Sequence, residues 1–230
     1  MKKILDFLIE VGKLKGRERR GWLIHNIPEK ETTASHSFRL ALLVWLLAKK
    51  KGELNIEKVL KMALIHDICE VYTWDETPYD PLIPRDVKKR DEIEKVLDKW
   101  PTFSMEDKKR KGKKKFAREY KSLQKLLAIL PKESQREFQM LWLEFEQGKS
   151  KEGRFVRQAD KMESYLQGME YWKKYGKIRY KLWARWAKEI FDDSVFIEFL
   201  REVDERFQNR RTQKKKRPVK PLSSKSVRKA

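Results

Sequence analysis

The stretch KMALIHDICEVYTWDETP, residues 61–78, places acidic and imidazole side chains in an apolar helical pattern. Its apolar residues and those just before it recur every three or four positions, which predicts one face of an α-helix over about 55–72. Continuing this face leads to His66, Asp67 and Glu70, so Asp67 stands where an apolar residue is expected. A buried carboxylate is costly unless it is protonated, paired or bound to a metal.

A second histidine begins another apolar pattern. The stripe of a helix predicted over about 36–50 leads back to His36 at its N-terminal end. If the two helices pack in antiparallel directions, His36 comes close to His66 and Asp67. Imidazole and carboxylate together are suitable ligands for Mn, Co, Fe, Ni or Zn. The chain has three histidines in all, and we assign no role to His25.

A lone histidine on an apolar helix face is more often an ordinary core residue than a ligand, and a His-Asp pair by itself is a weak motif. Here Glu70 follows the pair by one turn on the same predicted face, and a further histidine precedes it. Another acid, Asp160, lies in RFVRQADKME at the margin of an apolar stripe over 155–166. Together these residues favour a metal site.

The rest of the pattern predicts an all-α protein. Glycines (9) and prolines (8) are few, which argues against a β fold built from many turns. Gly52 is expected to end the helix predicted over about 36–50. A break is expected at Asp192-Asp193, within the helical stretch of about 178–207. The candidates for helix N-caps are Thr32, Thr33, Ser35 and Asn55. Helical periodicity is found over about 2–14, 36–50, 55–72, 85–99, 115–130, 133–147, 154–175 and 178–207.

The formal net charge of +21 is concentrated in two segments. The tail after Asn209 holds ten Lys or Arg and no acid, and the run KKRKGKKK at 108–115 holds seven more, which leaves +4 for the rest of the chain. Such runs are usually solvated appendages. We therefore expect one folded domain over 1–208 and a disordered basic tail over 209–230. Weak, non-specific binding of polyanions through the tail is the alternative use of this charge.

The sequence argues against secretion and against a membrane location. Cys69 is the single cysteine, so no internal disulfide can form, and a reducing compartment is expected. The N-terminal stretch is broken by Asp6 and Glu10 and lacks the features of a signal peptide. The longest apolar run, Leu40–Ala48, is much shorter than the roughly 20 residues that a membrane helix needs. We therefore expect a cytoplasmic protein.

The order His36, His66-Asp67, Asp160 resembles the H…HD…D signature of the HD superfamily of metal-dependent phosphohydrolases. More narrowly, the stretches GWLIHNIPEKETTASHSFRLALL, KMALIHDICEVYTWDETP and FVRQADKME are similar to the HD-domain 5'-deoxynucleotidase family, which removes phosphate from deoxynucleoside monophosphates. The resemblance covers roughly residues 1–175. It implies an HD-domain helical bundle that holds one divalent ion (Mn, Co, Mg, Ni, Fe or Zn) on those four side chains.

The resemblance also implies roles for other residues. Glu70 matches an acid near the attacking water, and Asp75 matches an acid near the substrate sugar. An arginine just before a tryptophan contacts the phosphate in this family; here it is Arg19 or Arg20, because one extra glycine precedes Trp22. Trp22 is expected to crowd the 2'-position of the sugar, and a homodimer is the family tendency. Each role has an ordinary alternative: a helix-end residue for Glu70, a turn cap for Asp75 and core packing for Trp22.

The segment of about 81–115, which we read as an insertion, and the basic tail are not recognised as family features. Because this segment directly follows the predicted site residues in the sequence, it bears on which substrate the protein accepts. The leading expectation is a phosphomonoesterase that acts on (deoxy)nucleoside 5'-monophosphates. The alternatives are another HD phosphohydrolase, acting on a nucleoside triphosphate, a guanosine alarmone or a cyclic nucleotide, and an HD scaffold bound to nucleic acid through its tail. The intact ligand set speaks against the scaffold, because apolar residues there would give more stability.

Overall fold

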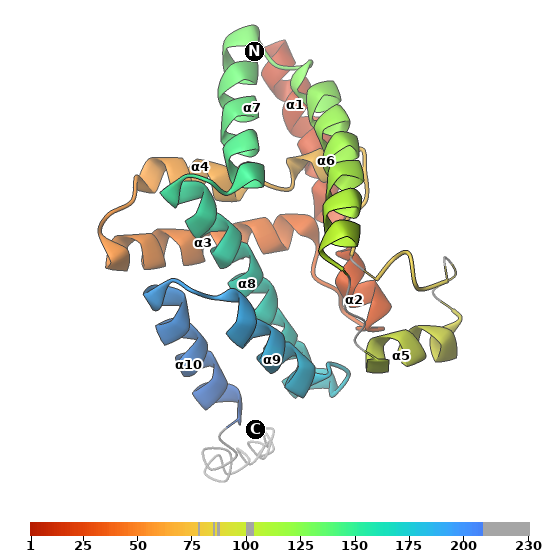
Figure 1. Ribbon diagram of the computed structural model, residues 1–230. Helices are drawn as coiled ribbons and strands as arrows, with labels where there is room; N and C mark the ends of the chain where they lie inside the picture. Colours follow the sequence, from red (N-terminus) through yellow and green to blue (C-terminus); the bar gives the residue numbers. More distant parts are fainter. Residues whose placement is uncertain (78, 85, 87, 100–103, 209–230) are drawn as a thin grey trace, which may run out of the picture.

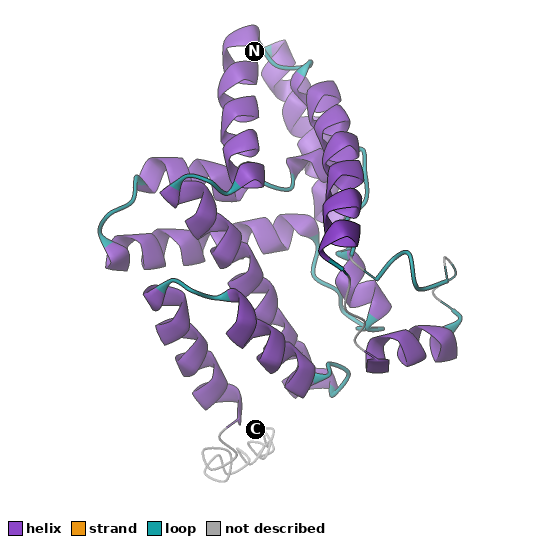
Figure 2. Cartoon of the chain, viewed as in Figure 1, coloured by secondary structure: helices purple, strands orange, loops and turns teal. Residues whose placement is uncertain are grey.

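The computed structural model describes residues 1–77, 79–84, 86, 88–99 and 104–208. This part of the chain consists of helices joined by loops, and it contains no strand beyond an isolated antiparallel bridge between Glu18 and Thr32 (Figures 1 and 2). The predicted all-α class is therefore confirmed. Within these residues, no helix combines the length and the apolarity that crossing a membrane requires.

The elements in chain order are α1 (Lys2–Gly12), η1 (Lys13–Gly16), α2 (Arg20–Ile24), α3 (Thr33–Lys51), α4 (Ile56–Ile65), η2 (Ile68–Val71), α5 (Arg90–Lys99), α6 (Met105–Leu127), α7 (Lys132–Gln147), α8 (Lys151–Tyr175), α9 (Tyr180–Ile190) and α10 (Ser194–Gln208).

Helices α3, α4 and α8 form the centre of the molecule. α3 and α4 lie side by side, and α8 crosses and contacts both of them (Figure 1). Around this centre α7 packs on α4 and α8, α9 and α10 pack on α8, and α6 packs on η2 and α7. The main core lies between these helices, and its most deeply buried side chains include Leu40, Val44, Val59, Met62, Phe155, Val156, Tyr165 and Phe196.

Both ends of α3 and the start of α4 lie at capping residues that the sequence predicts. The hydroxyl of Thr32 caps α3 by accepting a hydrogen bond from the N–H of Ser35 at 3.2 Å. α3 ends at Gly52, whose φ of 80° is a left-handed conformation that suits glycine. Asn55 then caps α4 by accepting from the N–H of Lys58 at 3.0 Å. These caps set where each helix begins, and therefore which side chains face the crossing with α8.

α4 ends earlier than predicted. It stops at Ile65, the backbone of Asp67 leaves the helical region at φ −107° and ψ 12°, and η2 follows. At this break the carbonyl of His66 accepts a hydrogen bond from Trp142 Nε1 at 3.0 Å. Because a buried carbonyl needs a partner, the indole of Trp142 stabilises this helix end. The prediction that Glu70 shares an α-helical face with His66 is therefore wrong, and Glu70 lies on η2 instead.

Two segments are helical where the sequence suggested otherwise. α2 lies between the helices predicted over about 2–14 and 36–50, in a stretch where no helix was predicted. The basic run 108–115, expected to be a solvated appendage, lies inside α6, which begins at Met105. Ser104 caps α6 by accepting a hydrogen bond from the N–H of Asp107 at 3.1 Å. Acidic residues in the first turn interact favourably with the positive end of the helix dipole. The cap and these acids explain why the helix begins before the basic run rather than after it.

The segment that was read as an insertion contains a packed helix. α5 buries Ile93 and Leu97 completely, against Ile24 of α2 and Ile83. This segment is therefore part of the folded domain in the residues that the structure describes. The expected break near Asp192 is confirmed, because α9 and α10 are separate helices. The predicted tail 209–230 lies outside the described residues.

Candidate metal centre

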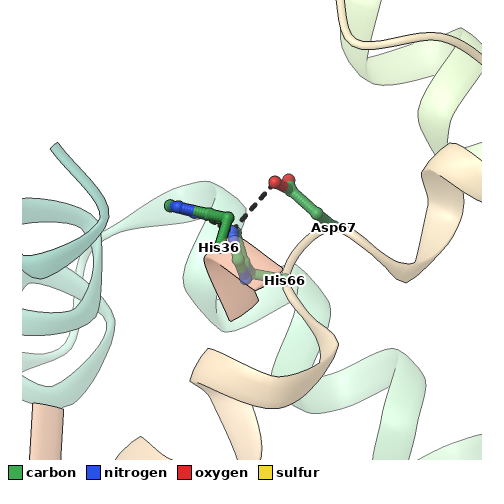
Figure 3. Close-up of side chains that lie close together, drawn as sticks. All are labelled: His36, His66 and Asp67. Carbon is green, nitrogen blue, oxygen red and sulfur yellow. Dashed lines mark hydrogen bonds and ion pairs between the residues drawn. The ribbon is translucent and has the colours of Figure 1, made fainter. Parts of the chain in front are cut away.

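Three elements bring the predicted ligands together. His36 lies on the first turn of α3, His66 and Asp67 follow the last residue of α4, and Asp160 lies on α8. The Nε2 atoms of the two histidines are 3.2 Å apart. Asp67 Oδ2 lies 3.0 Å from Nε2 of His66, and Asp160 Oδ1 lies 3.0 Å from Nε2 of His36. Figure 3 shows His36, His66 and Asp67 close together in this arrangement. The antiparallel packing expected for α3 and α4 is therefore confirmed.

The other ring nitrogen of each histidine faces an acceptor. His66 Nδ1 lies 2.9 Å from the carbonyl oxygen of Ala63, and His36 Nδ1 contacts the carboxylate of Glu163. A carbonyl or a carboxylate can only accept a hydrogen bond, so both Nδ1 atoms carry a proton. In the neutral form of each ring, Nε2 would therefore present its lone pair to the same small region. Neither ring is exposed there, because His36 and His66 are both buried.

This donor set fits a divalent cation. Ligand atoms that each lie about 2.0–2.2 Å from one ion are themselves about 3 to 3.5 Å apart. The spacings of 3.0–3.2 Å given above fit this, whereas Asp160 Oδ1 lies 3.9 Å from Nε2 of His66, so Asp160 stands closer to His36 than to His66. Two partly buried carboxylates beside two buried imidazoles also bring negative charge together, which a cation would offset. Mixed imidazole and carboxylate ligands suit Mn, Fe, Co, Ni and Zn.

The charges in this cluster depend on one another. Burial opposes ionisation of Asp67, but His66, Arg19 and His36 hold the pKa of its carboxyl well below the ordinary value. Burial likewise opposes ionisation of Asp160, whose pKa is nevertheless lowered to about 2, chiefly by its hydrogen bond with His36. Burial and Arg19 lower the pKa of His36, but its carboxylate neighbours outweigh them and raise it to about 10. The carboxylates are thus ready to bind a cation, whereas His36 must first release a proton.

A second set of groups also lies near His36. Ligand atoms of Glu31, His36 and Glu163 lie within 4.8 Å of one another. Here, however, guanidinium groups already balance the acids. Arg19 Nη1 lies 3.6 Å from Glu31 and 3.7 Å from Glu163, and Arg39 Nη2 lies 2.7 Å from Glu163. The Nε2 side of His36 is therefore the better candidate for a cation than this side.

Glu70 lies beside the predicted ligands and was itself predicted to have another role. Its side chain is buried, and Thr33 Oγ1 donates a hydrogen bond to its Oε2 at 2.7 Å. Burial, and then the charges of Asp67 and Asp75, raise the pKa of Glu70 well above its ordinary value. The structure thus excludes the exposed helix-end alternative for this residue. A buried carboxyl with a raised pKa can accept a proton more readily than an ordinary one.

The two arginines that the sequence left open diverge at the start of α2. The guanidinium of Arg19 lies among the site residues, with Nη1 3.1 Å from Ser164 Oγ and Nη2 4.0 Å from Asp160 Oδ1. Arg20 turns away, and its Nε donates a hydrogen bond to Asp80 Oδ1 at 2.6 Å. The structure therefore brings Arg19 to the ligands and pairs Arg20 with a neighbouring loop.

The two remaining predicted residues have structural roles of their own. Asp75 Oδ2 accepts a hydrogen bond from the backbone N–H of Arg20 at 3.0 Å, so it caps the start of α2. Trp22 is 3% exposed, and its ring stacks on Trp183 and meets the edge of Tyr171. Because these neighbours enclose the ring, its contact with a sugar stays a prediction.

Glu31, Glu163 and Arg39 also lie at the site, and none of the three was predicted from the sequence. Glu163 follows Asp160 by one turn of α8 and Ala159 by four residues, and it is fully buried. It therefore stands on the apolar stripe of α8 where a leucine would be expected, as Asp67 does in its own pattern. That signal was present in the sequence. Nothing comparable marked Glu31, which precedes α3 and accepts a hydrogen bond from Trp22 Nε1 at 3.0 Å.

Comparison with known proteins agrees with this geometry. A family model described as the HD domain matches residues 11–194. The 5'-deoxynucleotidase HDDC2 of Bos taurus is 31% identical over 74% of this chain and 68% of its own length. The 5'-deoxynucleotidase YGK1 of Saccharomyces cerevisiae is 30% identical over 83% of this chain and 77% of its own. A solved structure of a conserved hypothetical protein from Pyrococcus furiosus superimposes with a TM-score of 0.59 at 28% identity, covering 87% of this chain and 99% of that one.

The matched region includes all four converging side chains, from His36 on α3 to Asp160 on α8. The fold and the sequence similarity therefore lead to one conclusion. The chain belongs to the HD-domain family and, within it, to the group of its 5'-deoxynucleotidase relatives.

Proposed function

We propose that this chain is a metal-dependent phosphohydrolase that converts deoxynucleoside 5'-monophosphates to nucleosides and phosphate. The observation that carries the proposal is the convergence of the four ligands with the guanidinium of Arg19 beside them. Relatives of the chain are named 5'-deoxynucleotidases. A cation site next to a buried arginine suits the phosphate group of a monoester, because both carry charge of the opposite sign.

We assign one divalent ion to His36, His66, Asp67 and Asp160, with Mn, Co, Mg, Ni, Fe and Zn as the ions to test. Such an ion supplies positive charge against the phosphate and acidifies a water molecule. The part of the protein is to hold both imidazoles in the tautomer that presents Nε2 and to keep both carboxylates ionised, which the contacts described above favour.

Glu70 is the group that we assign to proton transfer. Its raised pKa makes it a stronger base than an ordinary carboxylate, and the hydroxyl of Thr33 holds one of its oxygens in place. We assign Arg19 to the phosphate oxygens and Asp75 to the sugar. Asp75 would act from the loop after η2 while its Oδ2 caps α2.

An exposed apolar stripe on α3 is the surface that we assign to a homodimer. Phe38, Leu42, Trp45 and Leu46 are each at least 41% exposed and lie one or two turns apart on one side of the helix. A stripe of large apolar side chains in water is typical of an interaction surface. The compartment, and weak polyanion binding through the tail, stay predictions.

The first prediction tests the reaction. We expect purified protein to release phosphate from deoxynucleoside 5'-monophosphates faster than from triphosphates or cyclic nucleotides, in a panel run with each divalent metal. Asp67→Ala should lose both the activity and the bound metal measured by elemental analysis, because it removes one ligand. Full metal retention in Asp67→Ala would refute the ligand assignment, and a clear preference for triphosphates would refute the substrate.

The second prediction separates chemistry from binding. Glu70→Gln keeps the size of the side chain and removes the base, so turnover should fall by ~10²–10⁴, the usual contribution of a positioned acid or base. Metal content and nucleotide binding, measured by calorimetry, should be retained. Loss of the metal would make Glu70 a ligand, and undiminished turnover would make it a bystander.

The third prediction uses the two neighbouring arginines as a matched pair. Arg19→Gln should lower kcat/KM for a deoxynucleotide by about 10- to 100-fold, because it removes charged hydrogen bonds to the phosphate. Arg20→Gln, which loses the partner of Asp80 instead, should retain nearly normal activity. The reverse order of effects would assign the phosphate to Arg20.

The fourth prediction concerns assembly. Wild-type protein should be a dimer by light scattering, and Trp45→Glu combined with Leu46→Glu should be a folded monomer, because the charges would make the stripe unfit for burial. Met140→Glu, at an exposed apolar residue of α7, serves as the control. A monomeric wild-type protein, or a double variant that remains a dimer, would remove this surface from consideration.

A further inference from the structure

The two nitrogens of His36 face two carboxylates of the same helix. Asp160 lies 3.0 Å from Nε2, and Glu163, three residues later on α8, contacts Nδ1. Residues three apart on a helix lie on the same side, one turn from each other. One helix thus supplies an acid to each side of the ring of His36. The acid on the Nε2 side is the one that we assign to the cation.

Glu163 is held from its other side by Arg39. Its carboxylate is fully buried, and its Oε1 accepts a hydrogen bond from Arg39 Nε at 2.7 Å. Arg39 also donates to Gln167 and Glu170, each at 2.7 Å, so its guanidinium lies along α8. Burying a carboxylate lowers the stability of the fold unless a positive group pairs with it in this way. The pairing fixes Glu163 where it meets the imidazole of His36.

The position of Arg19 shows what Glu163 prevents. Arg19 Nη1 lies 2.8 Å from the same Nδ1 atom, and a guanidinium can only donate hydrogen bonds. With Glu163 present, the proton that the neutral ring keeps is the one on Nδ1, which leaves the lone pair on Nε2 once the Nε2 proton has been released. Without Glu163, the donor nearest to Nδ1 would favour the opposite tautomer, in which Nε2 carries the proton and cannot bind a metal.

We propose that Glu163 is a positioning residue for His36: it selects the tautomer that presents Nε2 to the cation, and Arg39 holds it in place. This rests on the metal role proposed above for His36. Outer carboxylates that orient a ligand histidine usually change metal affinity by about 10- to 100-fold when they are removed.

The test measures zinc affinity and tautomer on the full chain. Zn²⁺ alone is the probe, titrated against a competing chelator dye. Glu163→Gln, which keeps an acceptor without its charge, should weaken zinc binding by about 10-fold, and Glu163→Met, which keeps neither, by about 100-fold. Glu170→Gln is the matched control, because Glu170 contacts Arg39 at the same 2.7 Å distance as Glu163 does. Within the part of the chain that the structure describes, Glu170 makes no hydrogen bond or ion pair with His36. Its zinc affinity should equal that of the wild type.

Imidazole ¹⁵N spectra give the second readout, and they are simple because the chain has three histidines. In the zinc-loaded wild type, His36 should be protonated on Nδ1, and in metal-free Glu163→Met it should shift towards protonation on Nε2. Zinc bound through Nδ1 in the wild type would overturn the proposal even if neither Glu163 variant folds. Wild-type affinity in Glu163→Met would also overturn it, as would an equal loss in Glu170→Gln, which would trace the effect to helix packing. A wild-type chain that binds no zinc, or one in which His36→Ala keeps it, would instead overturn the metal assignment itself.

Discussion

Acidic side chains that follow α4 or lie on η2 and α8 meet where these elements approach α3, and their mutual repulsion must be balanced at close range. The balancing groups are the guanidiniums of Arg19 and Arg39 and the imidazole of His36. They come from the start of α2 and from α3, so the balance requires these elements to stay in register with α8. The apolar core on either side of the crossing meets this requirement, because Leu40 and Val156 are both completely buried.

The interruption after α4 is the other condition for this site. A continuous helix would carry Asp67 and Glu70 past the imidazoles, whereas the break turns both carboxyl groups into the cluster. Helices from elsewhere in the chain satisfy the backbone groups that the break exposes. Trp142 of α7 donates to the carbonyl of His66, and Ser122 of α6 donates to the carbonyl of Cys69. Polar side chains of two distant helices thus stabilise the local irregularity that the chemistry needs.

Periodicity was enough to predict the helices that carry ligands, because an acid or a histidine on an apolar stripe stands out. The pattern predicted that His36 lies next to His66, and it indicated Asp160 as a third candidate. It could not place the break after Ile65, since that depends on a hydrogen bond from Trp142, which is remote in sequence. Nor could it choose between Arg19 and Arg20, because their directions are set by the cap at the start of α2 and by a loop residue, Asp80. Local patterns predict which faces are buried, and tertiary hydrogen bonds decide how chains turn between them.

Helix α5 has a consequence for how chains of this kind can diverge. It covers Ile24 with its own apolar side chains, and its acids Glu94 and Asp98 pair with Arg179 at the start of α9. A descendant protein with a shorter segment would expose Ile24 on α2 and would leave Arg179, at the start of α9, without these two acidic partners. We therefore expect the length of the segment to co-vary with the residues at positions 24 and 179. The candidate ligand positions lie on α3, after α4 and on α8, and we expect them to be free of that coupled change.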